Sequence, residues 1–84
     1  MNVFPNPVSN NRITLRYDLA KSANVSIELL SSTGQVINTI VSSQQKPYGT
    51  YWEGVETENL SAGIYFLRIN ADGISKTERV VIVD

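Results

Sequence analysis

The chain has 84 residues, which is the length of a single small domain. Its hydrophobic content of 42% argues against disorder, and its 7 basic and 8 acidic residues, without a Lys/Arg cluster, argue against nucleic acid or an anionic membrane as the main partner. The absence of Cys and His removes disulfides, thiolate nucleophiles, the usual general base and the commonest metal ligand.

The first segment, residues 1–11, has a proline on either side of Asn6. Pro5 and Pro7 cannot donate the hydrogen bonds of a central strand, so we expect an edge segment or an extended lead-in. The segment lacks the charged and apolar regions of a secretory signal peptide. The longest apolar run, residues 80–83, is too short to span a bilayer, so we expect either a cytosolic protein or a piece of a longer exported one.

Two strands with a clear pattern follow. In residues 12–19 and 24–30, large apolar side chains alternate with polar ones, which predicts strands with one buried and one solvated face. Gly34 lies in the connection at 31–34, where it can adopt the positive φ of a tight hairpin. The pattern of residues 35–41 is blurred, which indicates a strand with a bulge or a strand covered on both faces.

The second half contains three more predicted strands. Residues 42–48 are polar and contain the strand breaker Pro47, so we expect a loop there. The pair Asp72-Gly73 predicts a tight hairpin. The strands themselves are expected at residues 49–55, 63–70 and 76–83.

This succession of short strands, with no helical period, predicts an all-β fold. We expect residues 1–84 to form one small antiparallel, immunoglobulin-like β-sandwich of about seven strands, with a small barrel as the alternative.

Catalytic residues were sought among the serines and lysines. Without His, no Ser has an obvious activating base. A Ser–Lys pair with Lys21, Lys46 or Lys76 is conceivable, but each of these lysines is expected in a polar turn or loop, where it would be solvated and charged. We therefore predict no catalytic residue, no enzyme activity, no small-molecule substrate and no cofactor.

The closely spaced acids Glu53, Glu56 and Glu58 are the best candidates for a metal site. Period-two geometry places Glu53 on the opposite face from the other two, and no calcium-loop spacing is present. We predict surface carboxylates and no metal.

The aromatic residues Tyr48, Tyr51 and Trp52 could form a platform for stacking sugars. The competing interpretation places Trp52 and one Tyr in the core and the other Tyr at its rim. Taken alone, the residues indicate a small soluble β-sandwich without an active site, whose function is binding, spacing or signalling.

Four stretches in order carry a family resemblance. They are VFPNPVSNN at 3–11, IELLSSTGQVI at 27–37, LSAGIYFLRI at 60–69 and KTERVVIVD at 76–84. Together they resemble the carboxy-terminal sorting domains of the type IX secretion system of Bacteroidetes. Two positions depart from the family pattern, because Ser31 replaces an aspartate and Arg79 stands where lysine is commoner.

The resemblance implies an immunoglobulin-like domain at the end of a large exported protein. Such a domain is covalently fused to an amino-terminal cargo, which it carries through the periplasm to the outer-membrane translocon and on to the cell surface or medium. A sortase-like peptidase commonly removes it near its amino-terminal edge. The domain is then a signal and a substrate.

A physical interpretation of the same stretches gives several residues a role. Gly63 would allow a tight turn where a Cβ would clash, Tyr65 would lie on a strand that is central or covered on both faces, and Leu60 would close the end of the core. The last strand would present a docking edge, and deleting the last five residues is expected to abolish export while leaving the sandwich largely folded. For recognition we name Gly63, Tyr65, Lys76, Arg79, Val80, Val81, Ile82 and Val83. As structural motif residues we name Pro5, Asn6, Pro7, Gly34 and Leu60.

Two other functions remain open. A passive immunoglobulin-like module, similar to those of flagellar hook-cap proteins, is suggested by YGTYWEG followed by a G-x-Y strand. Carbohydrate binding is the other. A homodimer through exposed edge strands is also conceivable.

Overall fold

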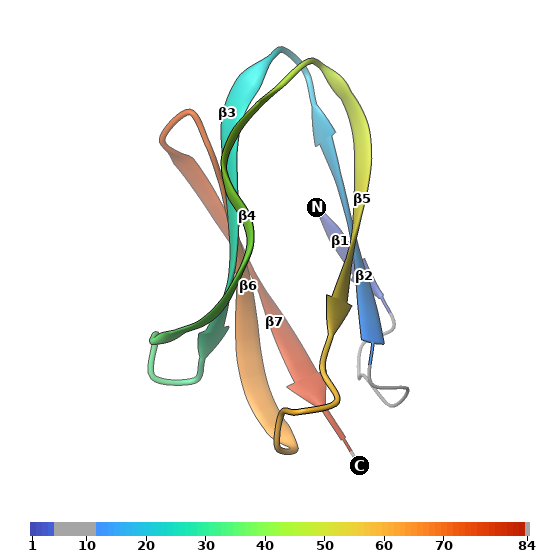
Figure 1. Ribbon diagram of the computed structural model, residues 1–84, viewed down its shortest axis with the longest axis vertical. Coiled ribbons are helices and arrows are strands. Elements are labelled where there is room, and N and C mark those ends of the chain that lie inside the picture. The colour runs from blue at the N-terminus through green and yellow to red at the C-terminus, as the bar shows by residue number, and fades with distance from the viewer. Residues whose placement is uncertain (5–11, 84) are drawn as a thin grey trace.

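Strands make up most of the computed structural model, which describes residues 1–4 and 12–83 (Figure 1). Within these residues there are seven strands and no helix. The strands are β1 Asn2–Phe4, β2 Arg12–Leu19, β3 Ala23–Ser31, β4 Val36–Lys46, β5 Gly49–Glu56, β6 Gly63–Ala71 and β7 Ile74–Ile82.

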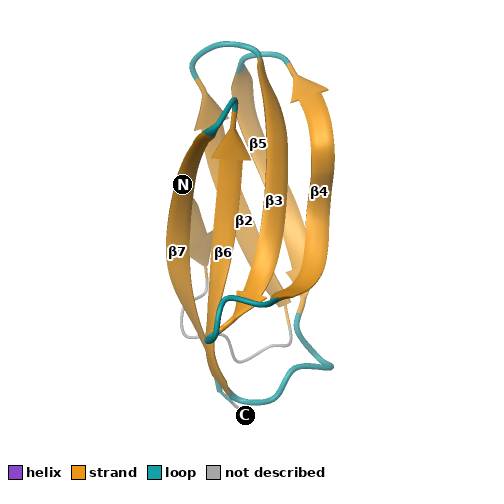
Figure 2. Ribbon diagram, turned by 90° about the vertical axis from the view of Figure 1, so that its left-hand side faces the viewer, coloured by secondary structure: helices purple, strands orange, loops and turns teal. Residues whose placement is uncertain are grey.

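The strands form two separate sheets that pack face to face (Figures 1 and 2). One sheet has the order β1-β2-β5 and the other the order β4-β3-β6-β7, and every pairing is antiparallel. The predicted small antiparallel β-sandwich of about seven strands is therefore confirmed, and the barrel alternative is wrong.

The core lies between the two sheets and is built from the alternating apolar positions. Because successive side chains of a strand point to opposite faces, every second residue of β2, β3, β6 and β7 contributes to it. Burial of each such side chain contributes about 1.5–3 kcal/mol. The most deeply buried aliphatic side chains are Ile13, Leu15, Val25, Ile27, Leu29, Val55, Leu67 and Val80.

The β3–β4 hairpin closes through a turn at residues 31–35. Gly34 has a φ of 90°, which an L-residue with a side chain rarely adopts. The Ser31 hydroxyl oxygen accepts a hydrogen bond from the Gln35 amide at 3.1 Å, and the Gly34 amide donates to the Ser31 carbonyl at 2.9 Å. Ser31 thus supplies a side-chain acceptor where the family pattern has an aspartate.

β4 is longer than predicted. It continues through residues 42–46, which were expected to form a loop, and pairs there with the first residues of β3. The register shifts along β3–β4 confirm the expected irregularity, and Ser43 has a φ of 47°. The alternative of a strand covered on both faces is wrong, because β4 is an exposed edge strand. Its polar composition reflects this exposure.

Two boundaries matter for the site. β7 begins at Ile74, directly after Asp72 and Gly73, whose φ values of 50° and 85° are those of a tight hairpin. β1 is the edge strand beside β2, and the predicted motif of Pro5, Asn6 and Pro7 lies outside the described residues.

Candidate recognition site

Tyr65 links the start of β6 to the preceding connection by a hydrogen bond. Its hydroxyl donates a hydrogen bond to the Ser61 carbonyl oxygen at 2.7 Å, while its ring packs against the core. This geometry resembles the tyrosine corner of immunoglobulin-like sandwiches. Leu60, in the same connection, also packs against the core, and its amide donates to the Thr57 carbonyl. The stretch LSAGIY is therefore explained locally by folding.

Gly63 adopts a backbone conformation that favours glycine, and no atom lies close to it where a side chain would begin. Its φ is 155°, and a Cβ built on it would meet no atom within 4 Å. The predicted clash is wrong, because β6 begins here at an exposed point of the surface. Glycine is favoured here only by its backbone conformation, because residues with a side chain rarely adopt this φ.

β6 is central in its sheet but is not covered on its outer face. It lies between β3 and β7, with Leu67 pointing into the core as expected. On the opposite face, Ile64 is 44% exposed and Phe66 and Arg68 are partly exposed. The expectation that the strand is central is right, and the alternative of cover on both faces is wrong.

β7 divides the predicted recognition residues between two faces. Val80 and Ile82 belong to the core, with exposures of 0% and 5%. Arg79 and Val81 lie on the outer face, opposite Phe66 and Ile64 of β6.

The remaining two predicted residues of this segment are also exposed. Val83, just after β7, is 41% exposed. Lys76 alternates with Arg79, lies on the inner side of β7 and lines a cavity near Met1. The recognition residues predicted from the sequence therefore do not form one surface.

Figure 2 shows the four-stranded sheet from its outer side. Near the end of β7, this face carries apolar side chains. We call this set the apolar patch, and it comprises Leu30, Val36, Ile64, Phe66 and Val81. They are neighbours by strand register, since Leu30 pairs with Val36 and Phe66, and Ile64 pairs with Val81.

Leu30 is only 6% exposed although it lies outside the core cluster, because its cross-strand neighbours cover it. Sequence reasoning missed Leu30, Val36 and Phe66 as members of a surface. The consecutive pair Leu29-Leu30, which breaks the alternation of β3, was the available signal.

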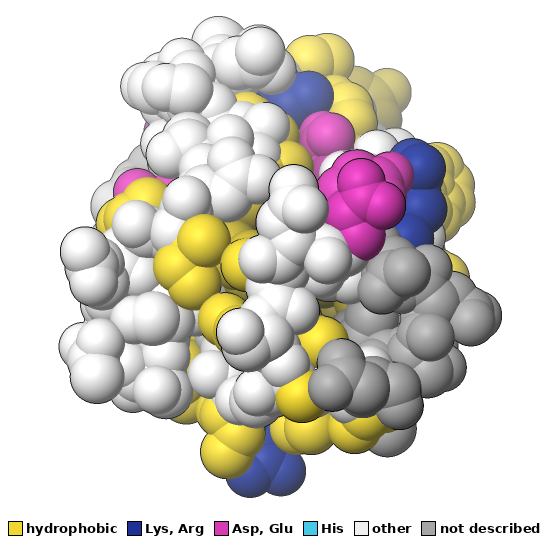
Figure 3. All heavy atoms as spheres, turned by 60° about the horizontal axis from the view of Figure 1, so that its bottom comes forward, with side chains coloured by type: hydrophobic (Ala, Val, Ile, Leu, Met, Phe, Trp, Pro, Cys, Tyr) yellow, Lys and Arg dark blue, Asp and Glu magenta, His cyan; other side chains and the backbone are white. Residues whose placement is uncertain are grey.

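Figure 3 turns the lower end of Figure 1, where the described chain ends, toward the viewer. Hydrophobic side chains lie at the surface of this end among uncharged groups, and most of the charged side chains in the view gather at its upper right.

The outer face of the three-stranded sheet carries several charged side chains, together with the exposed Phe4 and Trp52. Arg12 pairs with Glu56, Nη1 to Oε1, at 2.8 Å, and Arg16 pairs with Asp18 at 3.3 Å. The Thr50 hydroxyl donates to the same aspartate at 2.6 Å. Arg12 and Glu56, like Asp18 and Thr50, are cross-strand partners of β2 and β5, whereas Arg16 and Asp18 lie two residues apart on β2.

Trp52 lies on this outer face with 61% of its surface exposed, so its predicted place in the core is wrong. Tyr51 points the opposite way, stacks on the buried Tyr17 at 5.4 Å between ring centroids and donates its hydroxyl to the Pro47 carbonyl. Tyr48 is 76% exposed. Because Tyr51 and Trp52 point to opposite faces of β5, the three aromatics form no common stacking platform.

A polar group of side chains lies on the inner side of the three-stranded sheet. Lys46 ends β4, is 18% exposed, and places its Nζ 4.7 Å from the centre of the Tyr51 ring and 4.0 Å from Glu53. Lys46 and Lys76 both lie on strands, so their placement in loops is wrong, and for Lys76 the predicted strand at 76–83 holds instead. Burial, and then the neighbouring Glu53 carboxylate, raises the pKa of Tyr17 to about 12.

The acidic side chains considered for a metal are separated by the fold. Glu53 points inward from β5, whereas Glu56 points outward and pairs with Arg12. Within residues 1–4 and 12–83, no group of three or more Asp, Glu, His or Cys side chains is arranged to hold a metal ion. The same residues contain no helix long and apolar enough to cross a membrane.

The comparison with known families matches nearly the whole sequence. Residues 2–83 match the family model described as "Secretion system C-terminal sorting domain". No protein with a curated description matches the sequence. Because this match covers nearly the whole chain, the chain belongs to the family of type IX secretion carboxy-terminal sorting domains.

Proposed function

We propose that this domain is recognised by the outer-membrane translocon and by a sortase-like peptidase after its cargo has reached the periplasm. The coarser function follows from the family. A type IX sorting signal is attached to a cargo, interacts with the type IX machinery and leads to export across the outer membrane, to the cell surface or the medium. Domains of this family are typically not enzymes.

The observation that carries the proposal is the apolar patch beside the terminal strand. Ile64 and Val36 are 44% and 45% exposed there, although burial of apolar surface is what drives folding. A partner that covers these side chains would gain this burial on binding. We assign direct contact with the translocon to Arg79, Val81 and Val83, together with the apolar patch.

The other predicted recognition residues receive supporting roles. Val80 and Ile82 anchor β7 in the core, while Gly63 and Tyr65 set the start of β6. Lys76 faces the side of Met1, so we assign it to the side that the peptidase approaches.

An export assay tests the translocon surface. The domain, fused to a periplasmic reporter in a Bacteroidetes host, is expected to place the reporter at the surface or in the medium. The double variant Ile64→Ser/Val81→Ser should leave the reporter in the periplasm, because it removes the exposed Ile64 and the partly exposed Val81 from the apolar patch. The matched control, Phe4→Ser/Trp52→Ser, changes two exposed side chains of the other sheet and should export normally.

The outcome of this pair decides the proposal. Equal export by both double variants would contradict recognition through the apolar patch, provided that chemical unfolding shows both to be folded. If the reporter fused to the unchanged domain stays in the periplasm, the sorting function itself is contradicted and a passive immunoglobulin-like module is favoured.

Deletion of the last five residues is a less suitable test than expected from the sequence. The deletion removes Val80 and Ile82, which are buried, so it would destabilise the sandwich as well as remove the signal. Single changes at exposed positions separate these two effects.

A further inference from the structure

β1 covers only part of the edge of β2. Its three residues pair with Thr14, Leu15 and Arg16. Farther along the same edge, no strand within residues 1–4 and 12–83 pairs with Asp18 and Leu19 on the side of β1. The ladder thus stops before β2 does.

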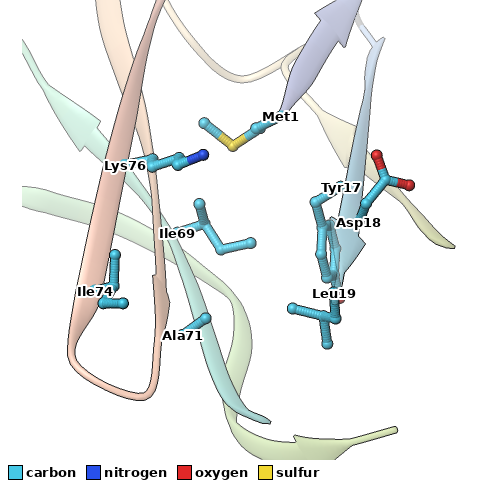
Figure 4. Close-up of a pocket in the computed structure, with 8 residues that line it drawn as sticks. All are labelled: Met1, Tyr17, Asp18, Leu19, Ile69, Ala71, Ile74 and Lys76. Carbon is cyan, nitrogen blue, oxygen red and sulfur yellow. The ribbon is translucent and has the colours of Figure 1, made fainter. Parts of the chain in front are cut away.

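A cavity of about 100 Å³ lies where the ladder stops. It is lined by Tyr17, Asp18 and Leu19 from β2, by Ile69, Ala71, Ile74 and Lys76 from the facing β6–β7 hairpin, and by Met1. Figure 4 shows Met1 and Lys76 pointing toward each other across one end of it.

The hollow continues past this cavity, along the β2–β3 connection and the β6–β7 turn. Ile74, which lines both parts, is 70% exposed. We call the two parts together the open groove.

We infer that the chain segment directly preceding Met1 in the exported protein extends β1 by three or four residues and fills the open groove. This inference rests on the proposed function, because a carboxy-terminal sorting domain is preceded by its cargo. The segment needs no separate partner. Its covalent attachment to β1 holds it at a high effective concentration beside the groove.

The register of the ladder specifies how the segment lies. Asn2 pairs with Arg16 and Val3 with Leu15, so the residue before Met1 falls opposite Asp18 and the second residue before Met1 falls opposite Leu19. Met1 and Val3 both pack against the core. Since strand side chains alternate, the second residue before Met1 points into the cavity between Leu19 and Ile74 and should be apolar.

The size and chemistry of the cavity fit this occupant. A cavity of roughly 150 Å³ lined by aliphatic and aromatic side chains can hold a benzene molecule. The present cavity, at about 100 Å³, offers room for one aliphatic side chain. The edge of β2 offers backbone groups to an added strand, as in strand addition to other sheet edges.

Filling the groove also fixes where the cargo leaves the domain. The extended strand would run toward the β2–β3 connection and the β6–β7 turn, away from the end that carries the apolar patch (Figure 1). The peptidase would then cut upstream of the docked residues. Cleavage and translocon recognition would take place at opposite ends of the sandwich.

Hydrogen exchange of the 84-residue chain, with and without six residues of the parent protein before Met1, tests the inference. The extension should slow amide exchange in residues 18–20 by about tenfold or more, because an added strand and its side chain cover this edge. A matched extension with Asp as the second residue before Met1 should lose most of this protection.

Ile74→Ser provides an independent measurement. In the 84-residue chain it should change the equilibrium constant of unfolding by less than about threefold, because Ile74 is largely exposed there. In the extended chain the effect should be about tenfold or more, since the segment buries this side chain.

Each outcome separates the possibilities. Equal exchange with and without the extension, or an equal effect of Ile74→Ser in both chains, would overturn the inference. Protection that rises with protein concentration in the 84-residue chain would assign the groove to a second copy and also overturn it. Export of the reporter is measured separately, so failure of this inference leaves the proposed sorting function intact.

Discussion

The two outer faces of the sandwich are built from similar strands but differ in chemistry. The face of β1-β2-β5 carries paired charges, such as Arg12 with Glu56, which keep it solvated. The face of β4-β3-β6-β7 carries the ion pair of Arg68 with Glu28 in its middle. Toward the end of β7 that second face carries the apolar patch, with Arg79 beside Phe66.

The difference between the two outer faces shows which outward-facing side chains the fold does not require to be apolar. The ion pairs of β2 show that outward positions of this sandwich can be charged, although Phe4 and Trp52 are also exposed on that face. The exposed Ile64 and Val36 therefore have no role that the core demands, and isolated exposed apolar residues are common but a neighbouring set is not. This contrast is why we place recognition on one face and not on the other.

The largest expected effect distinguishes the two sides of β7. Val80→Asp places a charge without a partner at a fully buried position, so the free energy of unfolding should fall by about 3–5 kcal/mol or more. Val81→Asp, one residue later on the outer face, should cost less than about 1.5 kcal/mol. Urea unfolding followed by circular dichroism measures both.

Comparable losses in the free energy of unfolding of these two variants would contradict the distinction between the two sides of β7. They would mean that the outer face at Val81 is as tightly packed as the core, and that the apolar patch stabilises the fold. The proposed division between folding and recognition would then fail.

The next effect concerns the turn that leads into the apolar patch. Tyr65→Phe removes the hydrogen bond to the Ser61 carbonyl and should lower the free energy of unfolding by about 1 kcal/mol. Tyr51→Phe is the matched control, because its hydroxyl makes an equivalent bond to the carbonyl of Pro47, four residues earlier. Thermal unfolding of both variants checks the prediction, and a loss of export by Tyr65→Phe without a loss of stability would instead indicate direct recognition.

The regular alternation of polar and apolar residues was sufficient to predict the fold. β2 was predicted with its observed boundaries, and the sandwich follows from strands that each have one apolar face. β4 was predicted too short because its last residues are polar on both faces, which is the composition of an exposed edge strand and of a loop alike.

The site was harder to predict than the fold, for a physical reason. Period two states that Val80 and Val81 point to opposite faces, but not which face is buried. Trp52 was misplaced because size suggested the core, whereas its alternation with Tyr51 and Val55 places it outside. The apolar patch combines residues from β3, β4, β6 and β7, and only the strand order shows that they are neighbours.

A smaller effect is expected on the charged face. Arg12→Gln removes the ion pair with Glu56, and since both side chains are more than half exposed, the loss should be about 0.2–1 kcal/mol at low salt and less at high salt. Unfolding of the variant and the parent chain at two salt concentrations measures the difference. A loss above about 2 kcal/mol that salt does not reduce would show that this face contributes to stability in the way the core does.

The smallest effect at neutral pH lies behind that face, at Tyr17. Its hydroxyl is buried without a hydrogen bond partner among the described residues, so Tyr17→Phe should leave the free energy of unfolding nearly unchanged at pH 7. The two chains should differ in alkali. Burial and the Glu53 carboxylate raise the folded-state pKa of Tyr17 to about 12, above the unfolded value of about 10.

The sign of the pH dependence follows from this order of pKa values. The folded state holds the phenol proton more tightly, so the stability that Tyr17 contributes is complete below pH 10 and is lost as the pH rises toward 12. Between these values the parent chain should lose stability more steeply than Tyr17→Phe. Unfolding midpoints at pH 9, 10, 11 and 12 measure this, and parallel declines in the two chains would show that the phenol behind the charged face is already solvated in the folded state.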